Sequence, residues 1–171
     1  MEQDKLYREA AGSYGAAMER LARAYEADPD RRRDLVQEIH IAIWRSFAAF
    51  DRRCSTRTWV YRVAHNAATA YVIRQQRNNA PLVSLEDLDQ LPGSDAGEAS
   101  ADRSRALERL LQLIQRLKPL DRQVILSYLE DMDAAAIGEI TGISARNVAT
   151  KIHRIKHILT RQFHQGGRHA G

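Results

Sequence analysis

Residues 134–159 have the sequence AAAIGEITGISARNVATKIHRIKHIL, and the architecture of the chain is easiest to infer from this segment. Apolar residues recur at helical spacing on both sides of Thr141-Gly142, which predicts two amphipathic helices separated by a tight turn. Gly142 can adopt the positive φ that ends a helix, and Ser144 can accept a hydrogen bond from a backbone N–H of the next helix. The segment therefore predicts a helix-turn-helix.

The second of these helices has the composition of a DNA-reading helix. The residues expected on its outer face are Arg146, Asn147, Thr150, Lys151 and Arg154. No Asp or Glu occurs in the sequence from Ser144 to Gly171. Arg, Asn and Thr side chains read base edges in the major groove, and further basic residues hold phosphates. An ordinary helical pair with a solvated basic face is the alternative for this segment taken alone.

The overall composition is that of a helical protein with a polyanionic partner. The 171 residues, of which 44% are hydrophobic, can form one medium domain or two small ones. A formal net charge of +4 favours nucleic acid as the partner. The single cysteine, Cys54, excludes an internal disulfide and a multi-cysteine zinc site. We find no signal peptide and no apolar run that could span a bilayer, so we expect a cytoplasmic protein without membrane insertion.

The N-terminal half predicts three helices, at about 6–25, 29–50 and 58–77. Asp28 can cap the second helix, with Pro29 at its first position. The third helix combines aromatic residues with Arg62, Asn66 and Arg74, which suits stacking with unpaired bases and hydrogen bonding to them. Burial in the core is the alternative role for two of its aromatic residues, Trp59 and Tyr61.

Residues 78–103 form an expected linker, because prolines and glycines break helices there and almost all of its charge is negative. Its apolar run at 82–91 is expected to dock on another element, and its acidic side chains could mimic nucleic acid in a basic groove. Helices are expected at 103–117 and 120–129, before the helix-turn-helix. We thus expect an all-α fold of two small helical domains, 1–77 and 104–165, joined by a flexible acidic linker and followed by a disordered tail at 166–171.

Three longer segments resemble a known family. DLVQEIHIAIWRSFAAF at 34–50 and STRTWVYRVAHNAATAYVIRQQR at 55–77 resemble the promoter-melting domain of bacterial RNA polymerase sigma factors. LKPLDRQVILSYLEDMDAAAIGEITGISARNVATKIHRIKHIL at 117–159 resembles the sigma domain that binds the minus-thirty-five promoter element. Two such domains joined by a short linker resemble the extracytoplasmic-function (ECF) group of the sigma-70 family. The resemblance implies an alternative sigma factor that binds core RNA polymerase, recognises both promoter elements and promotes DNA melting.

The resemblance also implies roles for individual residues. The polymerase-binding surface, which would dock on the clamp helices of the largest subunit, comprises Asp34, Gln37, Glu38 and Ile41. The flap of the polymerase is a second expected contact. The minus-ten element would be held and opened by Arg53, Cys54, Ser55, Trp59, Arg62, Asn66 and Arg74. The minus-thirty-five element would be bound by the five outer-face residues of the last helix. The chain itself would make and break no bond, so we expect no enzymatic activity, cofactor or metal, and an anti-sigma factor or another regulator is a further expected partner.

Three features depart from the family pattern or permit other roles. Arg31, Arg32 and Arg33 stand where the family often has acidic residues that meet the basic clamp, so we hypothesise that binding to core polymerase is weak or conditional. Cys54 lies among arginines that favour a thiolate, which leaves a redox role open. His153 and His157 have a spacing that can bind a metal, but no carboxylate or thiol lies nearby in sequence, and phosphate contacts or a solvated face explain them better.

Two other functions are compatible with the sequence. One is a helix-turn-helix regulator that binds duplex DNA without polymerase, although the aromatic, arginine-rich third helix argues against it. The other is a sigma-mimic that sequesters an anti-sigma factor. Loss of the basic residues of the last helix would favour this function, but here those residues are present. Binding to single-stranded minus-ten DNA distinguishes a sigma factor from both.

Overall fold

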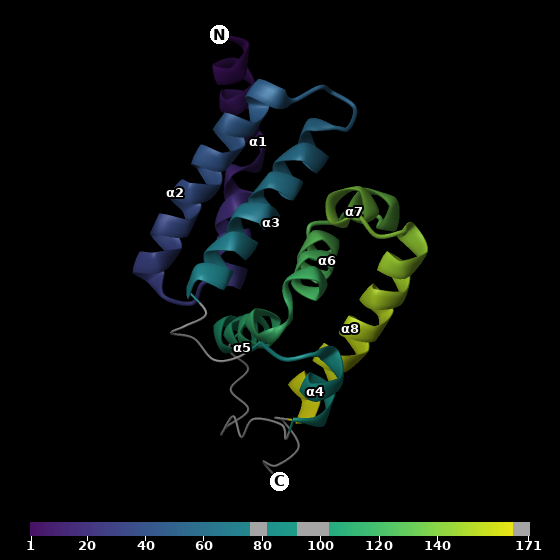
Figure 1. The fold of residues 1–171 in the computed structure, drawn as a ribbon. Helices are drawn as coiled ribbons and strands as arrows, with labels where there is room; N and C mark the ends of the chain where they lie inside the picture. Colours follow the sequence, from purple (N-terminus) through teal and green to yellow (C-terminus); the bar gives the residue numbers. More distant parts are fainter. Residues whose placement is uncertain (76–81, 92–102, 166–171) are drawn as a thin grey trace.

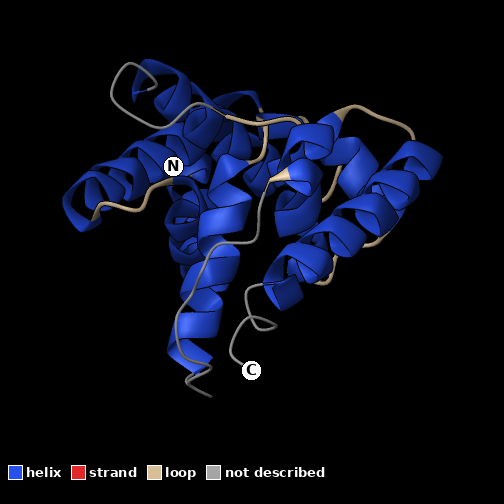
Figure 2. Ribbon diagram, turned by 90° about the horizontal axis from the view of Figure 1, so that it is seen from below, coloured by secondary structure: helices blue, strands red, loops and turns tan. Residues whose placement is uncertain are grey.

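The computed structural model describes residues 1–75, 82–91 and 103–165 (Figure 1). These residues form eight α-helices, one 3₁₀ turn and an isolated bridge between Val83 and Leu117, so the expected all-α fold is confirmed. Seen from below, the helices are connected mostly by short loops (Figure 2). The remainder of the expected linker, 78–81 and 92–102, and the tail at 166–171 lie outside the described residues. None of the described helices is long and apolar enough to cross a membrane.

The N-terminal half is a bundle of three long helices (Figure 1). These are α1 (Glu2–Tyr25), α2 (Pro29–Ser46) and α3 (Thr56–Gln75), with a 3₁₀ turn, Phe47–Ala49, after α2. The carboxylate of Asp28 accepts hydrogen bonds from the backbone N–H groups of Asp30 and Arg31, as expected of an N-cap. The core of this bundle is built from Met18, Leu21, Leu35, Ile39, Val60 and Ala64.

Trp44 shares the helical spacing of the buried residues Ile39 and Ile43, which predicts a core position, but the structure places it at the surface. Its side chain is 41% exposed, and its indole N–H donates to the carboxylate of Asp4, 3.1 Å away. The side-chain amide of Gln3 donates to the carbonyl of Trp44 at 2.8 Å. These contacts fix the first turn of α1, which explains why the helix begins at Glu2 rather than near Leu6.

The C-terminal half contains α5 (Arg103–Arg116), α6 (Pro119–Leu129), α7 (Ala134–Thr141) and α8 (Ala145–Gln165). Gly142 ends α7 with a φ of 81°, and the hydroxyl of Ser144 accepts a hydrogen bond from the backbone N–H of Asn147 at 3.2 Å. The helix-turn-helix is therefore formed as predicted. Its turn is tight at a second glycine: a Cβ on Gly138 would lie 2.7 Å from the carbonyl oxygen of Ile143.

The described part of the expected linker forms a short helix, α4 (Leu85–Gln90), capped by Ser84. Its apolar run docks as expected, because Leu85 and Leu88 are buried. The element beneath it is α8, from which the Gln162 amide donates to the Leu88 carbonyl at 2.8 Å. Six helical residues are too few for an apolar period to be visible, which is why the sequence indicated the docking and not the helix.

The two halves pack against each other, since α3 contacts α6 and α7, and α1 contacts α5 (Figure 1). Arg122 of α6 is at the centre of this contact and is only 1% exposed. Its guanidinium lies 4.8 Å from the ring centroid of Tyr25 in α1, and it donates to the carbonyl of Leu117 at 2.9 Å. The buried cation is thus stabilised by an aromatic face and by carbonyl groups, while its Nε is buried without a hydrogen-bond partner among the described residues.

Candidate nucleic-acid interface

The outer face of α8 presents part of the expected DNA-reading set to solvent. Arg146, Asn147 and Thr150 are exposed on its first two turns. The hydroxyl of Thr150 donates to the carbonyl of Arg146 at 3.1 Å, which leaves the oxygen able to accept from a base or a water molecule. The first turns of a helix after a tight turn are where helix-turn-helix proteins contact base edges.

The other two residues of that set are bonded within the chain. The ammonium group of Lys151 lies 2.7 Å from the carboxylate of Asp121 in α6, and Lys151 is half-buried. The guanidinium of Arg154 is paired with the carboxylate of Glu86 in α4. Two positive charges of α8 are therefore already matched by carboxylates, and DNA would have to compete for them.

The loop before α3 carries Arg53, Cys54 and Ser55. The hydroxyl of Ser55 accepts from the backbone N–H of Thr58 at 3.1 Å and so caps α3, which explains why this helix begins before Thr58. Arg53 lies 3.1 Å from the Asp51 carboxylate, and Cys54 is half-buried. The loop borders a hollow of about 610 Å³, between it and the start of α1, which is large enough to admit an unstacked base.

The candidate residues on α3 differ in accessibility. Asn66 is exposed, whereas Trp59 is half-buried, with its indole N–H donating to the Ser46 hydroxyl at 2.9 Å. Arg74 is exposed and pairs with Glu38 of α2 at 2.5 Å. Arg62 donates from two nitrogens, at 2.6 and 3.2 Å, to the carbonyl of Glu139 in α7. The structure thus leaves Asn66 exposed and gives both arginines of the α3 candidates protein partners.

Asp34, Gln37, Glu38 and Ile41 form one exposed face of α2, and Ile41 is 49% exposed. The preceding run of arginines is partly used within the chain. Arg32 donates to the carbonyls of Glu26 and Ala27, and Arg33 pairs with Asp30. The positive charge beside this face is therefore partly compensated.

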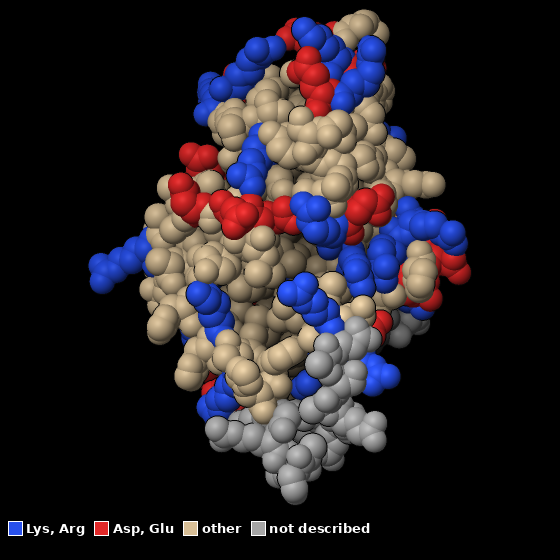
Figure 3. Space-filling view, turned by 180° about the vertical axis from the view of Figure 1, so that it is seen from behind, with Lys and Arg blue, Asp and Glu red and all other residues tan. Residues whose placement is uncertain are grey.

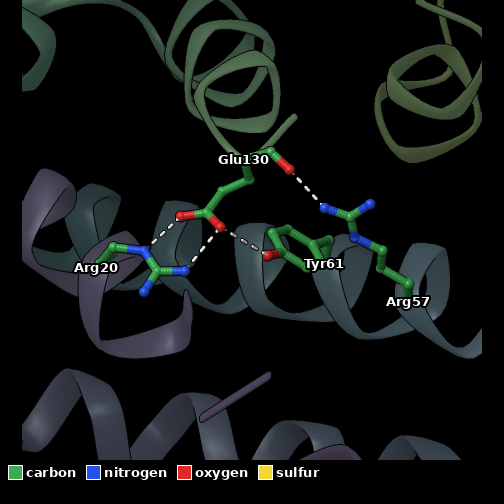
Figure 4. Close-up of polar contacts among 4 residues, drawn as sticks. All are labelled: Arg20, Arg57, Tyr61 and Glu130. Carbon is green, nitrogen blue, oxygen red and sulfur yellow. Dashed lines mark hydrogen bonds and ion pairs between the residues drawn. The ribbon is translucent and has the colours of Figure 1, made fainter. Parts of the chain in front are cut away.

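Sequence reasoning did not identify Glu130, which follows α6 and joins three side chains of the N-terminal half (Figure 4). Its carboxylate accepts from Arg20 at 2.7 and 2.9 Å and from the Tyr61 hydroxyl at 3.3 Å, and its carbonyl accepts from Arg57 at 2.5 Å. The hydrogen bond from Arg20 is the main reason why the pKa of Glu130 lies below its ordinary value. Burial, with the nearby carboxylate, raises the pKa of Tyr61 to about 12.

One face of the molecule carries charged side chains of both signs (Figure 3). On this face, which is turned away from the viewer in Figure 1, basic side chains lie above and below a short band of acidic ones (Figure 3).

Among the described residues, no group of three or more His, Cys, Asp or Glu side chains could hold a metal ion. His153 and His157 are both exposed on α8.

Comparisons with known proteins identify two matching family models. The model for Sigma-70 region 2 matches residues 11–78, and the model for Sigma-70, region 4 matches residues 107–158. RNA polymerase sigma factor YlaC of Bacillus subtilis is 27% identical over 125 residues, 72% of each chain. ECF RNA polymerase sigma factor SigW of the same organism is 24% identical over 141 residues, 76% of this chain and 74% of SigW. In a solved structure of CnrH in complex with the cytosolic domain of CnrY, the similar chain has 19% identity and a TM-score of 0.64 over 91% of this chain and 85% of that one.

Proposed function

Because the chain belongs to the sigma-70 family of RNA polymerase sigma factors, in its ECF group, and is an alternative sigma factor for transcription initiation, we propose how its surfaces divide that work. Core RNA polymerase and promoter DNA are the partners that these domains imply. The family that the sequence resembles is thus confirmed. The proposals below concern which residues meet each partner.

The minus-thirty-five element is assigned to α8. The observation that carries this assignment is the exposed set of Arg146, Asn147 and Thr150 at the start of a helix that follows a glycine turn. Arg and Asn can form paired hydrogen bonds with guanine and adenine, respectively. Lys151 and Arg154 contribute phosphate or base contacts once they exchange their carboxylate partners for DNA.

The minus-ten element is assigned to the loop at 51–56 and to α3. A flipped base would enter the hollow beside Cys54 and Ser55, with Arg53 nearby for the backbone. Trp59, Arg62, Asn66 and Arg74 would bind the opened strand along α3. Unstacking a base costs a few kcal/mol, which aromatic stacking and charge contacts offset.

Core polymerase is assigned to the α2 face of Asp34, Gln37, Glu38 and Ile41, which would dock on the clamp helices, with the flap as the contact of the C-terminal domain. We retain the hypothesis that Arg31, Arg32 and Arg33 make this docking weak or conditional. Asp30 compensates the charge of Arg33, whereas Arg31 and Arg32 have no carboxylate partner in an ion pair among the described residues, so repulsion falls mainly on these two residues. Docking at nanomolar strength by the unaided protein would contradict the hypothesis.

We further propose the domain limits 1–77 and 104–165, with 78–103 as linker, and a cytoplasmic location, where promoter DNA and polymerase are found. The chain itself would catalyse no reaction. An anti-sigma factor or another regulator is proposed as an additional partner. The similar chain CnrH was solved with a protein domain bound to it, that of CnrY, which supports a protein regulator for this chain as well.

The test is core-polymerase binding followed by run-off transcription from the upstream region of the chain's own gene and from a genomic pool. We expect promoter-dependent transcripts, which Asn147→Ala reduces and Arg105→Ala, an exposed α5 control, leaves unchanged. Duplex binding that does not require polymerase would favour an independent regulator. Absence of both polymerase and DNA binding would favour a sigma-mimic.

A further inference from the structure

The hollow beside the loop at 51–56 has a second wall, formed by the start of α1. Both elements lie at the same end of the N-terminal bundle (Figure 1). The residues of α1 that line this hollow of about 610 Å³, here called the α1 wall, are Glu2, Lys5, Leu6 and Glu9. Their spacing of three or four residues places them on one face of the helix. The helix therefore presents two carboxylates, an ammonium group and an apolar side chain to the space that we assign to a flipped base.

The α1 wall is held beside the loop and the end of α2 by polar contacts. The carboxylate of Glu2 accepts from the guanidinium of Arg52 at 2.6 Å. Arg52 has a φ of 63°, which is unfavourable for a residue other than glycine, and its bond to Glu2 supports the loop in this conformation. The side-chain amide of Gln3 donates to the carbonyl of Trp44 at 2.8 Å, and the indole N–H of Trp44 donates to Asp4 at 3.1 Å. The start of α1 is therefore fixed against both neighbours of the hollow.

Two charged groups of the α1 wall can bind a ligand in the hollow. The Lys5 ammonium lies 4.0 Å from the Glu9 carboxylate, which is too far for a hydrogen bond, and both side chains are exposed. An exposed ion pair of this kind contributes little free energy, so both groups can exchange it for another partner. On the loop side, the hydroxyl of Ser55 donates to the Thr58 hydroxyl at 3.0 Å and accepts from the backbone N–H of Thr58. Lys5 and Glu9 are therefore more available to a base than Ser55 is.

The apolar residues of the hollow can hold the faces of a base. Leu6 and Phe50 both line the hollow and are half-buried. The ring of Phe50 is supported from behind, because its centroid lies 5.1 Å from that of Trp59 and 5.8 Å from that of Phe47. Stacking on an aromatic ring stabilises any base with little regard to its identity. The choice among bases must therefore come from the polar groups that meet the edge of the base.

The charges of Glu9 and Lys5 favour some bases over others. A carboxylate accepts hydrogen bonds and an ammonium group donates them. Glu9 thus matches a base with an exocyclic amino group, which adenine, cytosine and guanine carry and thymine lacks. The single ring N–H of thymine lies between two carbonyl oxygens, which repel a carboxylate that approaches this edge. A thymine in the hollow would therefore leave the carboxylate without a good hydrogen bond.

From these observations we propose that Glu9 is a specificity-determining residue, which accepts a hydrogen bond from the amino group of the flipped base and discriminates against thymine. Lys5 binds the phosphate beside that base. The proposal deepens the assignment of the hollow to a flipped base and rests on it. The negative charge of Glu9 lowers the affinity for every DNA strand, so its contribution is a preference among bases and not a gain in overall affinity.

The test compares two bases that differ at the edge which Glu9 contacts. The full-length protein in complex with core polymerase is titrated with single strands from the minus-ten region of a promoter found by run-off transcription. Replacing one base at a time by an abasic site locates the flipped position, where loss of the base weakens binding most. That position is then filled with deoxycytidine or with deoxyuridine, in which a carbonyl replaces the amino group. We expect the wild type to prefer deoxycytidine about fivefold, the lower end of the range for a good base contact.

Glu9→Gln removes the charge and keeps the size of the side chain, and its amide can both donate and accept. It should reduce the preference for deoxycytidine to less than about twofold and raise the affinity for both strands, because a negative charge is lost. Glu19→Gln is the matched control, since Glu19 is exposed on the same helix and does not line the hollow. It should keep the preference of the wild type.

Lys5→Gln should weaken binding of both strands alike and lower the slope of log affinity against log salt by about one. An equal ratio of the two affinities in Glu9→Gln and in the wild type would overturn the role of Glu9.

The abasic strands separate this proposal from the assignment on which it rests. If no abasic site in the minus-ten region weakens binding, no base enters the hollow, and the assignment itself is wrong. If one abasic site weakens binding while the wild type and Glu9→Gln show the same ratio for deoxycytidine and deoxyuridine, a base enters the hollow but Glu9 does not read it. In that case only the proposal for Glu9 is wrong.

Discussion

The hydroxyl of Tyr25 lies 2.9 Å from Nδ1 of His65, and both side chains are buried. The other ring nitrogen of His65 is 3.4 Å from the hydroxyl of Ser127 in α6. His65 therefore links α1, α3 and α6, and with them the two halves of the molecule. Burial is the main reason, and the charge of Arg122 a second one, why the pKa of His65 falls from 6.5 to about 3. The imidazole is neutral while the two halves are in contact.

We predict that acid opens the molecule. Separation of the halves would admit water to His65 and remove Arg122, so its pKa would return toward 6.5. The contact between the halves thus has its full stability above about pH 6.5, and it loses stability as the pH falls toward 3, by up to about 1.4 kcal/mol per pH unit. Small-angle scattering should show a larger radius of gyration at about pH 5.5 than at about pH 7.5.

A neutral replacement isolates this effect. His65→Gln cannot gain a proton, so its radius should stay constant over the same pH interval, whereas the exposed-histidine control His157→Gln should expand as the wild type does. Glu130 does not contribute in this interval, because its pKa lies below its ordinary 4.5. Tyr25 also stays neutral, since burial raises its pKa. Expansion of His65→Gln at low pH would contradict the prediction.

A second prediction concerns α4. Glu86→Gln breaks the ion pair with Arg154 and should strengthen binding to a minus-thirty-five duplex by about twofold to fivefold at low salt. The gain should diminish as salt screens the exposed charges. Asp87→Asn, which removes an equal charge from the exposed face of the same helix, is the control and should change affinity less. Fluorescence anisotropy with a labelled duplex measures the affinity of both variants. An equal gain in affinity for the two variants would mean that net charge alone, and not the ion pair with Arg154, causes the effect.

The sequence predicts those features of the fold that depend on residues close together in the chain, and it does not predict contacts between distant residues. Gly142 and Ser144 act within one turn of their positions, and so the helix-turn-helix was predicted correctly, as was the cap at Asp28. The pairing of Arg20 with Glu130 joins positions 110 residues apart and has no sequence period. Trp44 has the spacing of a core residue, and its exposure depends on how α1 crosses α2.

The candidate site shows the same limit. Helical spacing correctly indicated that Arg146 and Asn147 are exposed on α8. It could not indicate that Lys151 faces Asp121 of α6, because the angle between two helices decides which flank of α8 is covered. The internal partner of Arg62 was likewise invisible, since a backbone carbonyl has no residue signature.

A third prediction tests the turn of the helix-turn-helix. Gly138→Ala would bring a Cβ to 2.7 Å from the Ile143 carbonyl oxygen, and we expect a loss of about 1–3 kcal/mol in the free energy of unfolding. Gly12→Ala is the matched control, because no heavy atom lies within 4 Å of its added Cβ and the site is exposed on α1. It should stabilise the protein by up to about 1 kcal/mol. Urea denaturation followed by circular dichroism gives both values, and equal shifts would refute the close approach.

The last prediction separates base reading from phosphate binding on α8. In the complex with core polymerase, Asn147→Ala should weaken binding to the cognate minus-thirty-five duplex by about 1–3 kcal/mol and leave the salt dependence unchanged, because a base contact releases no counterion. Arg154→Ala should weaken cognate and scrambled duplexes alike and lower the slope of log affinity against log salt by about one. Titrations over a range of salt concentrations supply both quantities. If Arg154→Ala instead removes discrimination between the two duplexes, Arg154 contacts a base, and the reading face of α8 extends one turn further toward its C-terminal end.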